Sequence, residues 1–212
     1  AFTQKKYDQA IPLLKESLRL DERPNRYSSL GLCYLRKKRY DLGILYYKKY
    51  FEVSNSRSNA IERSNLGMCY MNIGQHKNAQ KWFEDALKTD PKYVTAFWGL
   101  LTSLQNNGQN DILMKKYEEY VSNDPKFSDD EGVLRIMIEC QYDLGQYNDA
   151  LEFSNKLLNL NRDSKIDKIL PKIDGKRPSS DYTWRGFIFS HLQPRRYEDA
   201  YKCFENALKT DP

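Results

Sequence analysis

Apolar residues recur along this chain at the spacing of an α-helix. In the segment RYSSLGLCYLRKKRYDLGILYYKKY (residues 26–50), they lie three and four places apart on two successive stretches, with a polar joint at Lys37 to Tyr40. Such spacing puts apolar side chains on one face of each helix. No segment has the strict alternation, bounded by hairpin turns, that is typical of β-strands. The pattern predicts helix, short turn, helix, and hence an all-α fold.

The same pair of helices recurs. Leu30-Gly31 followed by Tyr34 returns as Leu66-Gly67 followed by Tyr70. The spacing from Leu30 to Leu66 is 36 residues, and the next corresponding positions, Leu100, Met137 and Phe187, follow after 34, 37 and 50 residues. A period in this range indicates a repeat protein, in which no unit buries its apolar faces alone.

These residues resemble the tetratricopeptide repeat (TPR) family, whose unit of about 34 residues carries W-x2-L-G-x2-Y, then A-x3-F and a closing proline. The best match spans residues 59–93, where the family positions are held by Leu66, Gly67, Tyr70, Ala79, Phe83, Ala86 and Pro91. The other units are degenerate copies. The resemblance implies a right-handed α-solenoid of tandem helix-turn-helix repeats.

We expect a single array over residues 1–212. It comprises a partial repeat at 1–22, full repeats at 24–57, 60–93, 94–127, 131–164 and 181–212, and a basic loop at 165–180. The array begins within a repeat and ends at Pro212 without the polar-faced helix that caps such stacks. We therefore expect the native molecule to continue, or another chain to cover its ends, and an isolated fragment to self-associate.

Composition narrows the class of protein. The chain has 34 Lys and Arg against 29 Asp and Glu, a net charge of +5, and its 13% aromatic content argues against disorder. No apolar run approaches the ~18 residues that cross a bilayer. We expect a soluble, intracellular protein of the cytoplasm that has no membrane partner.

The sequence offers no pattern typical of a catalytic, cofactor or metal site. Cys33, Cys69 and Cys140 share one repeat position, which Ser103 and Ser190 fill elsewhere, so we interpret them as small packing residues. His76 and His191 stand where other repeats have an aromatic residue. Neither a glycine-rich dinucleotide fingerprint nor a phosphate-binding loop is present. We expect a noncatalytic protein without cofactor or metal.

A solenoid of this kind offers a concave surface lined by its first helices. Helical spacing places a largely apolar stripe opposite the Leu-Gly-Tyr packing face. Methionine and aromatic residues there suit an amphipathic helix or extended peptide of a protein partner, although these side chains also fit simple packing against the next repeat. The stripe comprises Ser28, Leu32, Leu35, Ser64, Met68, Met71, Trp98, Thr102, Gln105, Arg135, Glu139, Tyr142, Arg185, Phe189 and Leu192.

Some family members hold acidic chaperone tails with Lys, Asn and Arg side chains at fixed places on three first helices. The matching places here hold Ser28, Leu32, Asn65, Thr95 and Gly99, so only the asparagine is kept and such a clamp is not expected. Arg135 and Arg185 leave room for an acidic partner toward the C-terminal end.

We expect a scaffold segment that binds a subunit of a multi-protein assembly. One alternative is the regulatory or substrate-selecting arm of an enzyme whose catalytic domain lies outside this chain. A second is nucleic-acid binding, suggested by basic clusters at residues 37–39, 48–49 and 175–177. We disfavour it because the stripe lacks a continuous run of basic residues.

Overall fold

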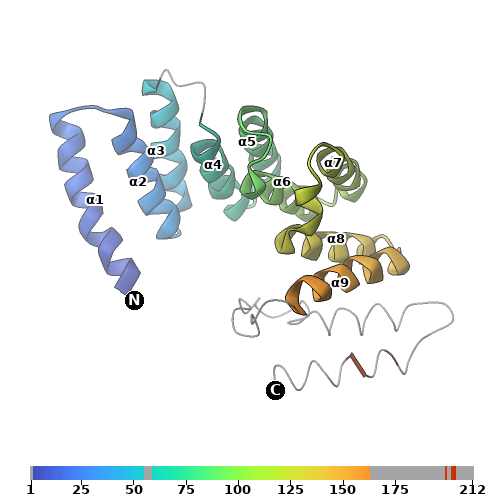
Figure 1. Ribbon diagram of the computed structural model, residues 1–212. Helices are drawn as coiled ribbons and strands as arrows, with labels where there is room; N and C mark the ends of the chain where they lie inside the picture. Colours follow the sequence, from blue (N-terminus) through green and yellow to red (C-terminus); the bar gives the residue numbers. More distant parts are fainter. Residues whose placement is uncertain (1, 55–58, 163–198, 200–201, 204–212) are drawn as a thin grey trace. The chain divides into compact units, whose positions relative to one another are not determined.

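The computed structural model describes residues 2–54, 59–162, 199 and 202–203, and every element within them is helical (Figure 1). The predicted all-α fold of paired helices is confirmed. The expected loop at 165–180 and nearly all of the repeat at 181–212 lie outside the described residues. The elements are α1 (Phe2–Leu20), α2 (Pro24–Arg36), α3 (Tyr40–Val53), α4 (Ala60–Asn72), α5 (His76–Thr89), α6 (Val94–Asn106), α7 (Asn110–Asn123), the 3-10 helix η1 (Pro125–Asp129), α8 (Glu131–Asp143) and α9 (Tyr147–Arg162).

Two compact units divide the chain, Ala1–Gln109 and Asn110–Pro212. In the first unit, each of the helices α1 to α5 packs on the helix that follows it in sequence (Figure 1). The first helices of successive pairs also contact one another, α2 with α4 and α4 with α6. A layer of first helices thus runs through this unit. The second unit holds α7, η1, α8 and α9, with α8 packed on α9 and η1 in contact with all three helices.

One turn geometry links the two helices of a pair. In the turn after α4, the N–H of Gln75 donates to the carbonyl of Tyr70 at 2.9 Å, and equivalent bonds close the turns at Arg39, Gln109 and Gln146. Each turn needs one left-handed residue, which is glycine at Gly74, Gly108 and Gly145, with φ of 75°, 69° and 74°. In the turn after α2 the same place is held by Lys38, with φ of 58°.

Side chains define where several helices begin. The side chain of Asn59 accepts a hydrogen bond from the backbone N–H of Glu62 at α4, and Asp130 accepts one from Val133 at α8, at 3.4 and 3.0 Å. Both satisfy N–H groups that the first helical turn leaves without a partner. At α2 the first position is Pro24, which has no N–H to satisfy.

The interior of the first unit is built from aromatic rings set against glycines. A Cβ on Gly67 of α4 would lie 2.9 Å from the ring of Phe83, and one on Gly99 of α6 only 2.4 Å from it. The fully buried Phe83 ring therefore touches the backbones of two first helices. In the preceding pair, Gly31 has the same relation to Tyr47, at 2.9 Å.

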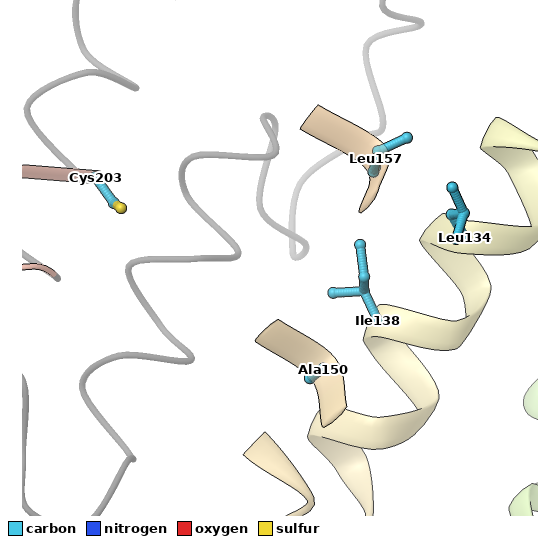
Figure 2. Close-up of a cluster of buried hydrophobic side chains, with 5 residues drawn as sticks. All are labelled: Leu134, Ile138, Ala150, Leu157 and Cys203. Carbon is cyan, nitrogen blue, oxygen red and sulfur yellow. The ribbon is translucent and has the colours of Figure 1, made fainter. Parts of the chain in front are cut away.

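The second unit packs differently. A buried cluster joins Leu134 and Ile138 of α8 to Ala150 and Leu157 of α9, and it includes Cys203 (Figure 2). Figure 2 shows Ile138 directed at α9 between Ala150 and Leu157. At the place corresponding to Gly67, this pair thus has a large side chain. Cys203 belongs to the same core as α8 and α9.

The 3-10 helix η1 is fixed to the second unit by an apolar and a polar contact. Phe127 is buried and meets the Tyr120 ring edge to face, with centroids 6.0 Å apart. From α9, the Lys156 ammonium donates to the Ser128 hydroxyl and forms an ion pair with Asp129, both at 2.9 Å. The hydrogen bond from Lys156 lowers the pKa of the Asp129 carboxyl.

We predict that Gly99→Ala destabilises the protein although alanine is the better helix former. Exposed Gly→Ala changes in a helix stabilise by about 0.5–1 kcal/mol, whereas overpacking a core costs about 1–3 kcal/mol. Because the new Cβ would overlap the Phe83 ring, we expect the free energy of unfolding to fall by an amount in the overpacking range, as measured by urea denaturation.

The double variant Gly99→Ala with Phe83→Leu identifies the cause. If the Phe83 ring is responsible, the alanine costs less free energy in the leucine background than in the native one. An equal cost in both backgrounds would contradict this assignment.

We also predict that Lys156→Gln lowers stability in a pH-dependent way. A carboxyl whose pKa is lower in the folded than in the unfolded state contributes stability above its unfolded pKa and loses it as the pH falls through the folded pKa. The stability difference between the native chain and the variant should therefore be largest at neutral pH and shrink between about pH 5 and pH 2. Denaturation across that range measures it, and a difference independent of pH would contradict the role of Asp129.

Candidate partner-binding surface

The solvent-facing side of α2, α4 and α6 forms one surface of the first unit. Its residues recur at helical spacing on each helix, and all are at least partly exposed. We call this surface the unit 1 face. It comprises Asn25, Ser29 and Leu32 on α2, Ile61, Asn65 and Met68 on α4, and Thr95, Trp98 and Thr102 on α6.

The unit 1 face differs from the predicted stripe on part of each helix. Leu32, Met68, Trp98 and Thr102 belong to both, and Met71 and Gln105 are half-buried. Leu35 and Ser64 are 7% and 0% exposed. Side chains that lack exposed surface cannot contact a partner, so these two lie outside the unit 1 face.

Contacts between neighbouring first helices explain the offset. The Ser28 hydroxyl donates to the Glu62 carboxylate at 2.8 Å, a bond that links α2 to α4. Residues on that side of α2 therefore turn toward the next first helix rather than toward solvent. A position that faces the next first helix and a position that faces solvent can be neighbours in the sequence. One residue corresponds to a rotation of about 100° around a helix.

Sequence reasoning missed Ile61, which is 54% exposed at the start of α4. The large apolar side chain of Ile61 lies on the same side of α4 as Asn65 and Met68, which are partly exposed. Its spacing of four and seven residues from these two was the available signal.

In the second unit, the predicted stripe residues make contacts within their own unit. Arg135 forms an ion pair with Glu131 one turn earlier on α8, at 2.9 Å. The Tyr142 ring meets Tyr147 edge to face, with centroids 5.4 Å apart, and packs against the buried cluster. Glu139 is half-buried. Truncating Tyr142 would therefore disturb folding as well as any surface it contributes to.

The remaining predicted stripe residues, Arg185, Phe189 and Leu192, lie outside the described residues.

The cysteines lie in the packing positions that the repeat pattern assigned to them. Cys33, Cys69 and Cys140 are all buried. A Cβ on Gly43 of α3 would lie 2.8 Å from the Cys69 sulfur, so this thiol fills the space that the glycine leaves. Burial raises the pKa of Cys69 to about 12 and that of Cys140 to about 11. The thiolate, which is the reactive form, is therefore scarce at neutral pH.

The geometry also bears on the acidic-tail clamp. At the place where clamp proteins carry a basic side chain on the third first helix, this chain has Gly99, which is covered by Phe83. No long side chain fits there without displacing the ring. The position of Gly99 therefore has no room for the basic side chain that clamp proteins carry there.

Comparison with known proteins identifies the repeats. Family models described as tetratricopeptide repeat match residues 1–57 and 63–93. These two matched segments are tetratricopeptide repeats. The recurring glycine, tyrosine and alanine positions that suggested the resemblance are those on which the helix pairs pack.

A curated relative of the repeats is the BBSome complex member BBS4 of Bos taurus. The two are 28% identical over 114 residues, which is 54% of this chain and 22% of that protein. The matched part of the repeats thus spans about a fifth of the relative's length.

Solved structures share the fold at low identity. The C-terminal part of a TPR repeat-containing protein from Cytophaga hutchinsonii has a TM-score of 0.75 and 19% identity, over 99% of this chain and 76% of that one. MamA has a TM-score of 0.67 and 16% identity, over 89% and 91%. YrrB, described as a TPR protein with an unusual peptide-binding site, has a TM-score of 0.65 and 17% identity, over 94% and 92%.

None of the helices in the described part of the chain combines the length and the hydropathy that a membrane span requires.

We predict that the buried cysteines react slowly while the protein is folded. Burial raises the pKa of Cys69 to about 12, so little of the reactive thiolate is present at neutral pH. Alkylation by iodoacetamide, followed by mass spectrometry, should modify Cys69 at least ~100-fold more slowly in buffer than in denaturant. Rapid modification of Cys69 in the folded protein would contradict the packing role.

Proposed function

We propose that this chain is a noncatalytic interaction module that holds a protein partner on the first-helix side of its repeats, as a part of a multi-protein assembly. In this proposal the repeats stack as one array, and the partner contributes a peptide or helix. No chemical step is assigned to the chain.

The observation that carries the proposal is the unit 1 face. Leu32 is 37% exposed and Ile61 is 54% exposed, and the partly exposed Met68 and Trp98 lie on the same face. Large apolar side chains gathered on one surface are typical of protein interaction sites. Here they are held by helices whose other sides are packed, so the surface is formed before a partner arrives.

The relatives support the same class of function. BBS4 is described as a member of a complex, and YrrB as having a peptide-binding site. Both descriptions are of other proteins, and they favour assembly and peptide binding over other functions for this chain. A protein that co-purifies with the full chain can be identified and its affinity then measured by calorimetry.

We predict that Trp98→Ala weakens binding of that partner at least ~10-fold while shifting the unfolding midpoint only modestly. Large aromatic residues anchor interfaces, and loss of one typically costs 1–2 kcal/mol or more of binding free energy. Because Trp98 is half-buried, thermal unfolding is measured beside affinity to separate the two effects.

The matched controls are Lys77→Ala and Lys81→Ala, both exposed on the second helix α5. They should leave the partner's affinity within about twofold of the native value, since they lie away from the first helices. If these changes weaken binding as much as Trp98→Ala, the partner occupies the second-helix side and the proposed surface is wrong.

A further inference from the structure

The unit 1 face carries no ionisable side chain. Its nine residues are amides, hydroxyls and apolar side chains, whereas 30% of the residues in the whole chain are charged, so about three would be expected among nine. Residues 1–109 contain 18 Lys and Arg against 10 Asp and Glu, a difference of +8. The face is thus uncharged within a markedly basic unit.

Charged residues of these first helices are directed elsewhere. Arg26 of α2 forms an ion pair with Asp21 at 3.0 Å, and Glu62 of α4 accepts the hydrogen bond from Ser28. The Arg63 guanidinium lies over the Phe51 ring of α3, 5.4 Å from its centroid. Arg36, at the last residue of α2, is exposed one turn beyond Leu32, and α6 contains no charged residue. Arg36 follows the face at the C-terminal end of α2, and the other charged residues of α2 and α4 make contacts away from the face.

The second unit lacks this property. At the position of α8 that corresponds to Leu32 and Met68 stands Glu139, a partly exposed acidic residue. A partner that crosses α8 at this position meets a charge. Among the described first helices, the uncharged face is therefore a property of α2, α4 and α6 that α8 does not share.

An uncharged face selects its partner by desolvation. A charged side chain pressed against it loses water and gains no opposite charge, which is unfavourable. An apolar side chain gains by leaving water, at roughly 25 cal/mol for each Å² buried. The excess of basic residues elsewhere in the unit further disfavours a basic segment.

Resting on the proposed function, we infer that the segment bound at the unit 1 face presents apolar side chains and no ionisable ones at its contact positions. Its affinity comes from apolar burial and depends little on salt. The exposed amide of Asn25 can supply polar contacts to an uncharged peptide, and the Thr102 hydroxyl, which donates to the Trp98 carbonyl at 2.9 Å, can still accept one.

A random dodecapeptide library displayed on phage tests this inference with the full chain as bait. Selection is carried out in parallel against the native chain and against Met68→Glu, which places a charge in the middle of the face. Peptides retained only by the native chain bind through the face. We expect Asp, Glu, Lys and Arg to fall well below their frequency in the unselected library at the recurring positions.

The consensus peptide is then synthesised and its affinity measured by fluorescence anisotropy. The dissociation constant should change less than about twofold between low and high salt, where a contact with charged residues would weaken markedly. Met68→Glu should weaken binding at least ~10-fold, Met68→Leu should not, and the exposed Lys81→Glu on α5 is the matched charge control. Circular dichroism verifies that each variant is folded.

Three results would overturn the inference. They are enrichment of acidic or basic residues at the recurring positions, affinity that falls more than about tenfold with salt, and no peptide that distinguishes the native chain from Met68→Glu. In the first two cases the proposed function still holds if Met68→Glu abolishes binding of the charged peptides, because those peptides then bind at the unit 1 face. If the co-purified partner is also insensitive to Trp98→Ala, the proposed function fails as well.

Discussion

The first unit depends on one steric contact, an aromatic ring pressed against a backbone that has no side chain. Phe83 reaches Gly67 in its own pair and Gly99 in the next first helix, so a single ring sets the approach of three helices. Any Cβ at either glycine would occupy space that the ring already fills. Because the ring touches two successive first helices, it fixes how α4 and α6 lie beside one another.

In the second unit the large side chain of the helix pair comes from the first helix instead of the second. Ser154 stands four residues after Ala150, as Phe83 stands four after Ala79, and it is fully buried although it is small. The corresponding first helix carries Ile138 where α4 carries Gly67, and that side chain points at α9 between Ala150 and Leu157 (Figure 2). Cores tolerate such exchanges when their total volume is kept. The degenerate repeats have thus moved the large side chain from the second helix to the first.

Helix pairs and glycine turns could be predicted because spacing and left-handed turn residues are local signals. The cysteine positions followed from the period, and their burial agrees with it. The left-handed turn residue Lys38 was not predictable, because lysine is not typical of that conformation and its turn is held by neighbouring hydrogen bonds. The exposed line on the first helices was predicted only in part, since a residue such as Ser64 differs from Asn65 by one place and is turned toward a neighbour by contacts distant in sequence.

The packing of the first helices places few demands on the composition of the unit 1 face. Glycine, cysteine and aromatic positions fix one side of each first helix, so the opposite side bears little of the folding energy. Charged residues would be the ordinary choice for such a side in a water-soluble helix. The exposed side chains of Leu32 and Ile61 gain no free energy from contact with water. In the proposed function a partner covers this surface, and that contact rather than folding accounts for its uncharged composition.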